Sequence, residues 1–172
     1  MKQLVIAGAI VLVIGGVALG VRIHDASVAA ERTKLAVEHT RDEARQLIRY
    51  CENRAGLAGT LGMATARFEL YIATHDRANL QRVMTDLVEQ TLGAYEMACT
   101  GAKTDIAFVQ ANVVEPDSWI DVKADEVAGH IAYLARVRAA SEALRSAIDT
   151  NAADDVLVQR LAALTETAKP PP

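Results

Sequence analysis

Cys51 and Cys99 are the only two cysteines of the 172-residue chain, and their spacing is its clearest chemical signal. In an antiparallel pair of helices, residues at the same height have numbers that average to the middle of the turn. The two cysteines average to 75, and His75 lies in a predicted turn. A disulfide between them would close a loop of about 48 residues and stabilise the fold by roughly 4 kcal/mol. Two buried free thiols are the alternative in a reducing compartment.

Histidines next to carboxylates are the second feature that could do chemistry. Glu126 and His130 are four residues apart on one predicted helix, and His39 is close to Asp42 and Glu43. A metal site needs further ligands, and isolated pairs of this kind are usually surface hydrogen bonds. The sequence also lacks the zinc-protease, haem-attachment, nucleophile-elbow and nucleotide-loop patterns. We therefore assign no catalytic, metal or cofactor residue and expect a non-enzymatic protein.

Trp119 is the only tryptophan, and it follows Pro116 in a segment with loop character. A lone tryptophan can anchor a partner, because it combines a large apolar area with a polar N–H group. The same side chain can instead pack over the end of a helical bundle. The sequence leaves both interpretations open, so Trp119 is a candidate partner contact.

An unbroken apolar run of about 18 residues, Leu4–Val21, lies between Lys2 and Arg22. This length is close to the roughly 20 residues that a helix needs to cross a bilayer. We predict that residues 1–22 form a transmembrane anchor in contact with membrane lipid. A cleaved signal peptide is an alternative, with Ala18 and Gly20 at the cleavage site. A buried core helix is a further alternative, although the run has no polar face.

Gly8, Gly16 and Gly20 share one face of this apolar run. Small residues four apart allow two helices to approach closely in lipid, so self-association through these glycines is one hypothesis. Glycine is also frequent in membrane spans for other reasons, which leaves composition alone as the alternative.

The charges on the two sides of the run favour opposite orientations of the chain in the membrane. Arg22, Arg32, Lys34 and Arg41 favour a cytoplasmic main domain, whereas Lys2 on a very short N-terminal tail resists translocation. Large domains often cross regardless of charge, so we predict a single-pass protein with an extracytoplasmic, periplasmic main domain.

Good helix formers dominate the rest of the chain, and only 4% of the residues are aromatic. We predict an all-α fold with three to five helices in an elongated antiparallel bundle. Residues 23–43 form a helical stalk, 44–168 the bundle and 169–172 a disordered proline tail. The first helix is expected to run to about Ala73, with a stripe that includes Ala44, Leu47, Ile48, Cys51, Ala55, Ala58, Leu61, Phe68 and Ile72.

Further helix boundaries follow from capping residues. Asp76 is a good N-cap for a second helix, which we expect to stop near Gly101. Thr104 or Asp105 would cap a shorter helix. The next helix carries a core stripe, a turn follows at Thr150-Asn151, and Asp154 or Asp155 starts the last helix. The stripe consists of Val127, Ile131, Leu134, Val137, Ser141, Leu144 and Ile148.

The function that this pattern favours is structural. A net charge of −4 with both signs interspersed is not typical of a nucleic-acid-binding surface. We expect a spacer or scaffold in a cell envelope or membrane-containing assembly, with protein partners and a homo-oligomeric or larger assembly. The alternatives are an extracytoplasmic ligand-sensing bundle and a secreted helical protein whose signal peptide has been removed.

Overall fold

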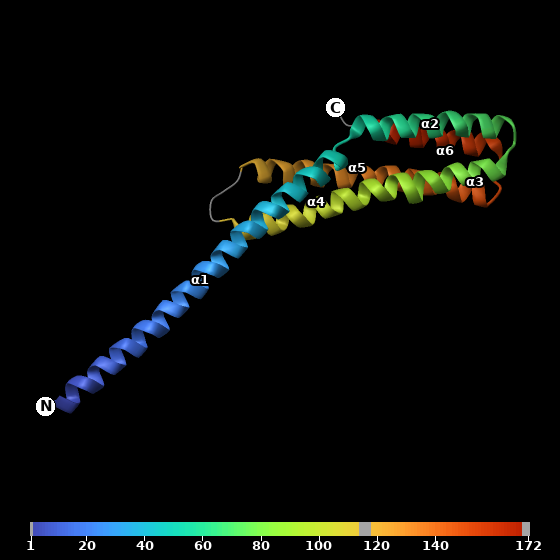
Figure 1. Ribbon diagram of the computed structural model, residues 1–172. Coiled ribbons are helices and arrows are strands. Elements are labelled where there is room, and N and C mark those ends of the chain that lie inside the picture. Colours follow the sequence, from blue (N-terminus) through green and yellow to red (C-terminus); the bar gives the residue numbers. More distant parts are fainter. Residues whose placement is uncertain (1, 114–117, 170–172) are drawn as a thin grey trace. The chain divides into compact units, whose positions relative to one another are not determined.

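The computed structural model describes the backbone of residues 2–113 and 118–169, and the side chains of residues 27–53, 55–113 and 118–169. Within these residues the regular secondary structure is entirely helical, which confirms the predicted all-α bundle (Figure 1). The helices are α1 (Lys2–Cys51), α2 (Arg54–Ala73), α3 (Arg77–Thr85), the π-helix η1 (Asp86–Leu92), α4 (Gly93–Asn112), α5 (Ser118–Asp149) and α6 (Asp154–Thr167).

The chain divides into two compact units, Met1–Thr40 and Arg41–Pro172. The first unit consists of most of α1. The predicted anchor, with Gly8, Gly16 and Gly20, lies outside the described side chains, and so does the tail Pro170–Pro172. Among the side chains that are described, no helix has both the length and the apolar character that a bilayer crossing requires.

The second unit is built from two helical hairpins whose turns lie together. The helix α2 packs against α3 and α6, while α5 packs against α3, η1, α4 and α6 (Figure 1). His75, in the first turn, pairs through Nδ1 with Asp154 at 2.8 Å, and Arg77 donates to the carbonyl of Ala152 in the second turn. These contacts fix the two hairpins at the same end of the bundle.

Both turns form where the sequence predicts them. The Asp76 carboxylate accepts a hydrogen bond from the Asn79 backbone N–H at 3.2 Å, so Asp76 is the N-cap of α3. His75 and Asn151 adopt left-handed backbone conformations, with φ of 54° and 52°. Asn is one of the few non-glycine residues that adopt this conformation readily, which suits Asn151 to the second turn.

The expectation of one helix running to Ala73 is wrong, because the chain bends at Glu52–Asn53. The Asn53 side chain accepts from the Gly56 N–H at 3.0 Å and starts α2. A Cβ on Gly56 would lie 2.6 Å from Asn53 Nδ2, so a larger residue there would require the capping side chain to shift. The bend turns Ala55 and Ala58 to solvent, while Leu61, Phe68 and Ile72 remain buried as predicted.

The predicted helix end near Gly101 is also wrong, since α4 continues to Asn112. Gly101 serves close packing instead: a Cβ there would lie 3.0 Å from Cδ1 of Leu47 on α1. Thr104 is likewise inside the helix, where its hydroxyl donates to the carbonyl of Thr100 at 3.0 Å. A hydroxyl that donates to the carbonyl four residues earlier makes its hydrogen bond within the same helix, so it does not cap a new one.

The core stripe of α5 is confirmed. Ile131 is half-buried, and the other six predicted positions are buried. The last helix begins at Asp154, also as predicted, and it buries Leu157, Leu161 and Leu164.

Replacing Gly101 by valine tests the close packing between α1 and α4. We expect Gly101→Val to lower the free energy of unfolding by about 1–3 kcal/mol, because its branched side chain would overlap Leu47. The matched control is Gly129→Val on α5, where a Cβ has no neighbour within 4 Å. Chemical denaturation measures both, and shortening Leu47 to alanine should recover part of the loss in the Gly101→Val background. Equal effects of the two valines would contradict the packing role.

Candidate functional site

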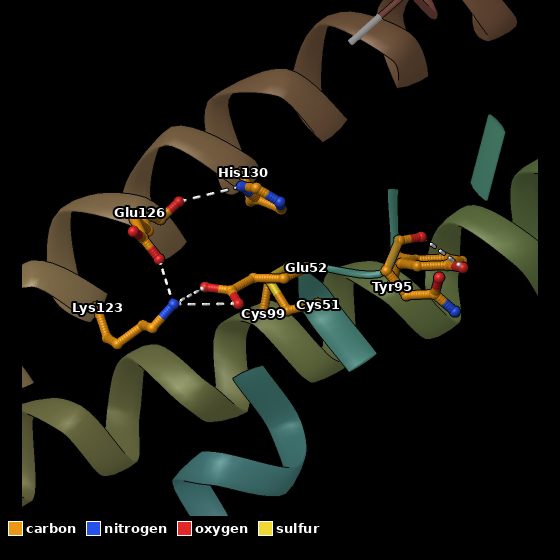
Figure 2. Close-up of a disulfide and its surroundings, with 8 residues drawn as sticks. Cys51, Glu52, Tyr95, Cys99, Lys123, Glu126 and His130 are labelled. Atoms are coloured by element: carbon orange, nitrogen blue, oxygen red, sulfur yellow. Dashed lines mark hydrogen bonds and ion pairs between the residues drawn. A yellow bond between two sulfur atoms is a disulfide. The ribbon is translucent and has the colours of Figure 1, made fainter. Parts of the chain in front are cut away.

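The candidate site is the region around Cys51 and Cys99, which we call the disulfide junction. Cys51 is the last residue of α1, and Cys99 lies in α4. The structure joins them by a disulfide with a Cα–Cα distance of 5.0 Å, which confirms the predicted pairing (Figure 2). Both residues are buried, so the bridge forms part of the core.

Three charged side chains lie on one side of this bridge (Figure 2). Lys123 Nζ on α5 pairs with Glu52 Oε1 at 3.0 Å and with the Glu126 carboxylate one turn along α5 (Figure 2). The hydrogen bonds to Glu126 and then Glu52 raise the pKa of Lys123. The same contact with Lys123 is the main reason why the pKa of Glu126 is lowered. The lysine therefore holds the bend at Glu52 against α5.

Two tyrosines cover another side of the junction. The rings of Tyr50 and Tyr95 lie 4.9 Å apart between centroids, in a tilted arrangement. The Tyr95 hydroxyl donates to the carbonyl of Asn53 at 3.4 Å, a backbone acceptor at the bend (Figure 2). Burial, followed by the neighbouring Tyr50, raises the pKa of Tyr95. The hydroxyl therefore stays protonated and remains a donor at neutral pH.

Trp119 lies at the start of α5 and is half-buried. The guanidinium carbon of Arg45 on α1 lies 5.2 Å from the centre of the Trp119 ring, within the range of a cation–π contact. This contact agrees with the packing interpretation of Trp119. Its role as a partner contact remains a prediction.

The histidine–carboxylate pairs do not assemble into a larger cluster. The His130 ring is buried, and its Nδ1 lies 3.1 Å from the backbone carbonyl of Glu126 (Figure 2). Within the described residues there is no group of three histidine, cysteine, aspartate or glutamate side chains that could hold a metal ion.

A second polar cluster, which the sequence analysis missed, lies where η1 meets α4 and α5. Arg138 donates from Nε and Nη2 to the two Glu96 carboxylate oxygens at 2.5 and 2.6 Å, and from Nη2 to the Val88 carbonyl at 3.3 Å. The Glu96 contact is the main cause of the raised pKa of Arg138. A π-helix shifts the backbone hydrogen-bond pattern, and the arginine donates a hydrogen bond to a backbone carbonyl within the shifted segment. No sequence pattern predicts a π-helix. The opposite charges of Arg138 and Glu96 are a signal by which their pairing could have been predicted.

Together these residues fasten helices to one another. The disulfide joins α1 to α4, the Lys123–Glu52 pair joins α5 to the bend after α1, and the Arg138–Glu96 pair joins α5 to α4. Comparisons with protein-family models, curated proteins and solved structures found no match for this chain. The contacts described here are those of structural cross-links.

Removing the disulfide should lower the stability of the bundle. We expect Cys51→Ala together with Cys99→Ala to reduce the free energy of unfolding by about 2–4 kcal/mol, because the unfolded chain loses a constraint spanning about 48 residues. Denaturation of the wild type with and without a dithiol reductant measures the same difference. A wild-type midpoint that does not respond to the reductant would contradict a bridge that stabilises the fold.

Asp105 should make stability depend on pH in a defined direction. Burial, and then the neighbouring Glu43 carboxylate, raise the pKa of Asp105 above its ordinary 3.8. The folded state therefore binds the proton more tightly, and stability falls as pH rises through the interval between 3.8 and the raised value.

We expect Asp105→Asn to raise the melting temperature at pH 7, with no such gain at about pH 3, where the native carboxyl is protonated in both states. The control is Asp125→Asn, at an exposed position of α5. Thermal unfolding across this pH range provides the measurement. A gain that persists unchanged at low pH would contradict the electrostatic cause.

Proposed function

We propose that the protein is a non-enzymatic, membrane-anchored helical spacer that holds its bundle on the extracytoplasmic side of a membrane. One observation carries the proposal: the same helix, α1, contains the apolar run Leu4–Val21 and ends at the disulfide-bonded Cys51. The apolar run has the length of a membrane span. A structural disulfide is typical of an oxidising compartment such as the periplasm or cell exterior.

The cross-links between helices support a mechanical role for the bundle. Aromatic residues make up only 4% of the chain, and covalent and ionic links add to the mainly aliphatic core in holding the helices in place. The Cys51–Cys99 bridge and the Lys123–Glu52 pair both act at the end of α1. A bundle fastened where its connecting helix ends is suited to keeping a fixed form between a membrane and a protein partner. The partner is part of the proposal and would belong to the same envelope or assembly.

A second candidate is ligand sensing, which one groove favours. Between α2 and α6 lies a groove of about 590 Å³, lined by apolar residues such as Ile72 and Leu161 and by polar residues such as Thr65 and Lys169. This volume lies in the range of small-molecule sites. A metabolite that raises the melting temperature of the wild type, but not of Ala162→Trp with its groove filled, would favour sensing over a spacer.

A charge placed in the apolar run tests the anchor. We expect Val13→Arg to move the full chain from the membrane pellet to the soluble or degraded fraction, because an arginine at a span centre costs about 2.5–3.5 kcal/mol. Val13→Leu, the matched control, should remain in the membrane after a carbonate wash. Fractionation with intact-mass analysis provides the readout.

Two outcomes would overturn the membrane-anchored spacer. The first is a mature wild-type chain in the soluble fraction without its first twenty or so residues, which is the signal-peptide alternative. The second is a wild-type chain that retains these residues but washes off the membrane as readily as Val13→Arg.

A further inference from the structure

The helix α2 is apolar on two opposite faces. Its core face buries Leu57, Leu61, Phe68 and Ile72. Its outer face is exposed and carries no charge; it consists of Ala55, Gly59, Gly62, Met63, Ala66, Leu70 and Ala73. An exposed apolar face of this kind is a candidate interaction surface. The exposed surface of α6, by contrast, carries Asp155, Gln159, Arg160 and Glu166.

Packing within the described part of the chain does not require the glycines of this outer face. A Cβ on Gly59 or Gly62 would meet no atom within 4 Å, so no neighbouring segment there requires a glycine. Each glycine in a helix interior costs about 0.5–1 kcal/mol relative to alanine. Large side chains stand beside them, since Met63 and Leu70 are 60% and 57% exposed. Small and large residues alternate as in a surface that packs against another helix.

We propose that a second copy of this chain covers the outer face of α2, with the two α2 helices antiparallel about a two-fold axis. A two-fold contact uses the same patch on both copies. We place the two-fold axis at the height midway between Ala64 and Thr65. Leu70 of one copy then lies opposite Gly59 of the other, and Met63 lies opposite Ala66. Each large residue then fills the space above a small one.

Charge at the edge of this face agrees with the same pairing. Arg67 on α2 and Asp86 on η1 line one groove beside Met63. Ala64 lines the same groove, so Asp86 lies near the height of Ala64, beside the proposed axis. Within the described residues Arg67 makes no ion pair in its own chain. In the dimer, Arg67 of one copy and Asp86 of the other differ in height by about 3 Å, measured along the α2 helix axis.

The area of the face indicates how the dimer would form. The 20 residues of α2 extend about 30 Å, and a strip about 10 Å wide gives roughly 300 Å² on each copy. A stable free interface needs about 800 Å² on each side. The contact is therefore suited to copies that a common membrane already concentrates, and this step rests on the proposed anchor.

Cross-linking of the full chain in its membrane tests the dimer. A thiol at Ala66→Cys would lie beside the axis, and a short bis-maleimide reagent would join two copies without touching the native disulfide. The control Ala107→Cys places a thiol at another exposed alanine, on α4. We expect a dimer band from Ala66→Cys at least about tenfold stronger than from Ala107→Cys.

A second substitution separates a specific face from simple crowding. In the Ala66→Cys background, Leu70→Lys should reduce the dimer band at least about tenfold, because the ammonium would be buried against Gly59 of the second copy. Val122→Lys is the matched control, since Val122 on α5 is 56% exposed and lies outside the face. It should leave the band unchanged.

Three results would overturn the proposal: equal bands from Ala66→Cys and Ala107→Cys, a band that Leu70→Lys does not weaken, or a product whose mass includes a different protein. The anchor is judged separately by fractionation. A membrane-bound chain without the Ala66→Cys band refutes the dimer alone, whereas a soluble chain with the band refutes the anchor alone.

Discussion

The rest of the second unit depends on how the chain is held where α1 ends. A break between two helices exposes backbone groups that lack helical partners, and each must find another one. Here the Asn53 side chain satisfies the Gly56 N–H, and the Tyr95 hydroxyl adds a second donor to the Asn53 carbonyl, which also accepts from the Leu57 N–H. The disulfide ties the last residue of α1 to α4 at the same point. The break is therefore a fixed corner, which allows α2 to pack against both α3 and α6.

Charged side chains perform a similar task along α5. Lys123 contacts the corner at Glu52, and Arg138 reaches both Glu96 and the π-helical carbonyl of Val88. Such bidentate arginine–carboxylate contacts are among the stronger polar interactions on proteins. They act between half-buried groups, where screening by solvent is reduced. The core is mainly aliphatic, with few aromatic residues, and these links add directional contacts to its packing.

Sequence reasoning succeeded where a local rule decides the structure. The cysteine pairing followed from the symmetry of an antiparallel hairpin. Asp76 and Asn151 mark a cap and a turn by their own chemistry, and Asp154 is an acidic residue in the first turn of α6. It failed at Gly101, because a glycine that ends a helix and a glycine that admits a neighbouring side chain look identical in sequence. Leu47, the neighbour in question, lies more than fifty residues away in the chain.

Other features could be found only in three dimensions. The Asn53 cap was overlooked since a continuous apolar stripe appeared to run through it, although asparagine before a glycine-rich stretch is a usable signal. The π-helix at Asp86–Leu92 has no sequence signature. The second apolar face of α2 became visible only when the core face had been identified, because alanine and glycine suggest no orientation by themselves.

The proposed function places a disulfide-fastened bundle outside the cytoplasm, on an apolar anchor. The most direct measurement is peptide mapping of the protein from intact cells whose free thiols were alkylated before lysis, performed on the membrane fraction without reductant. The account predicts a single cross-linked peptide pair containing Cys51 and Cys99, in a chain that retains Leu4–Val21. Two alkylated cysteines in the membrane-bound chain would contradict it.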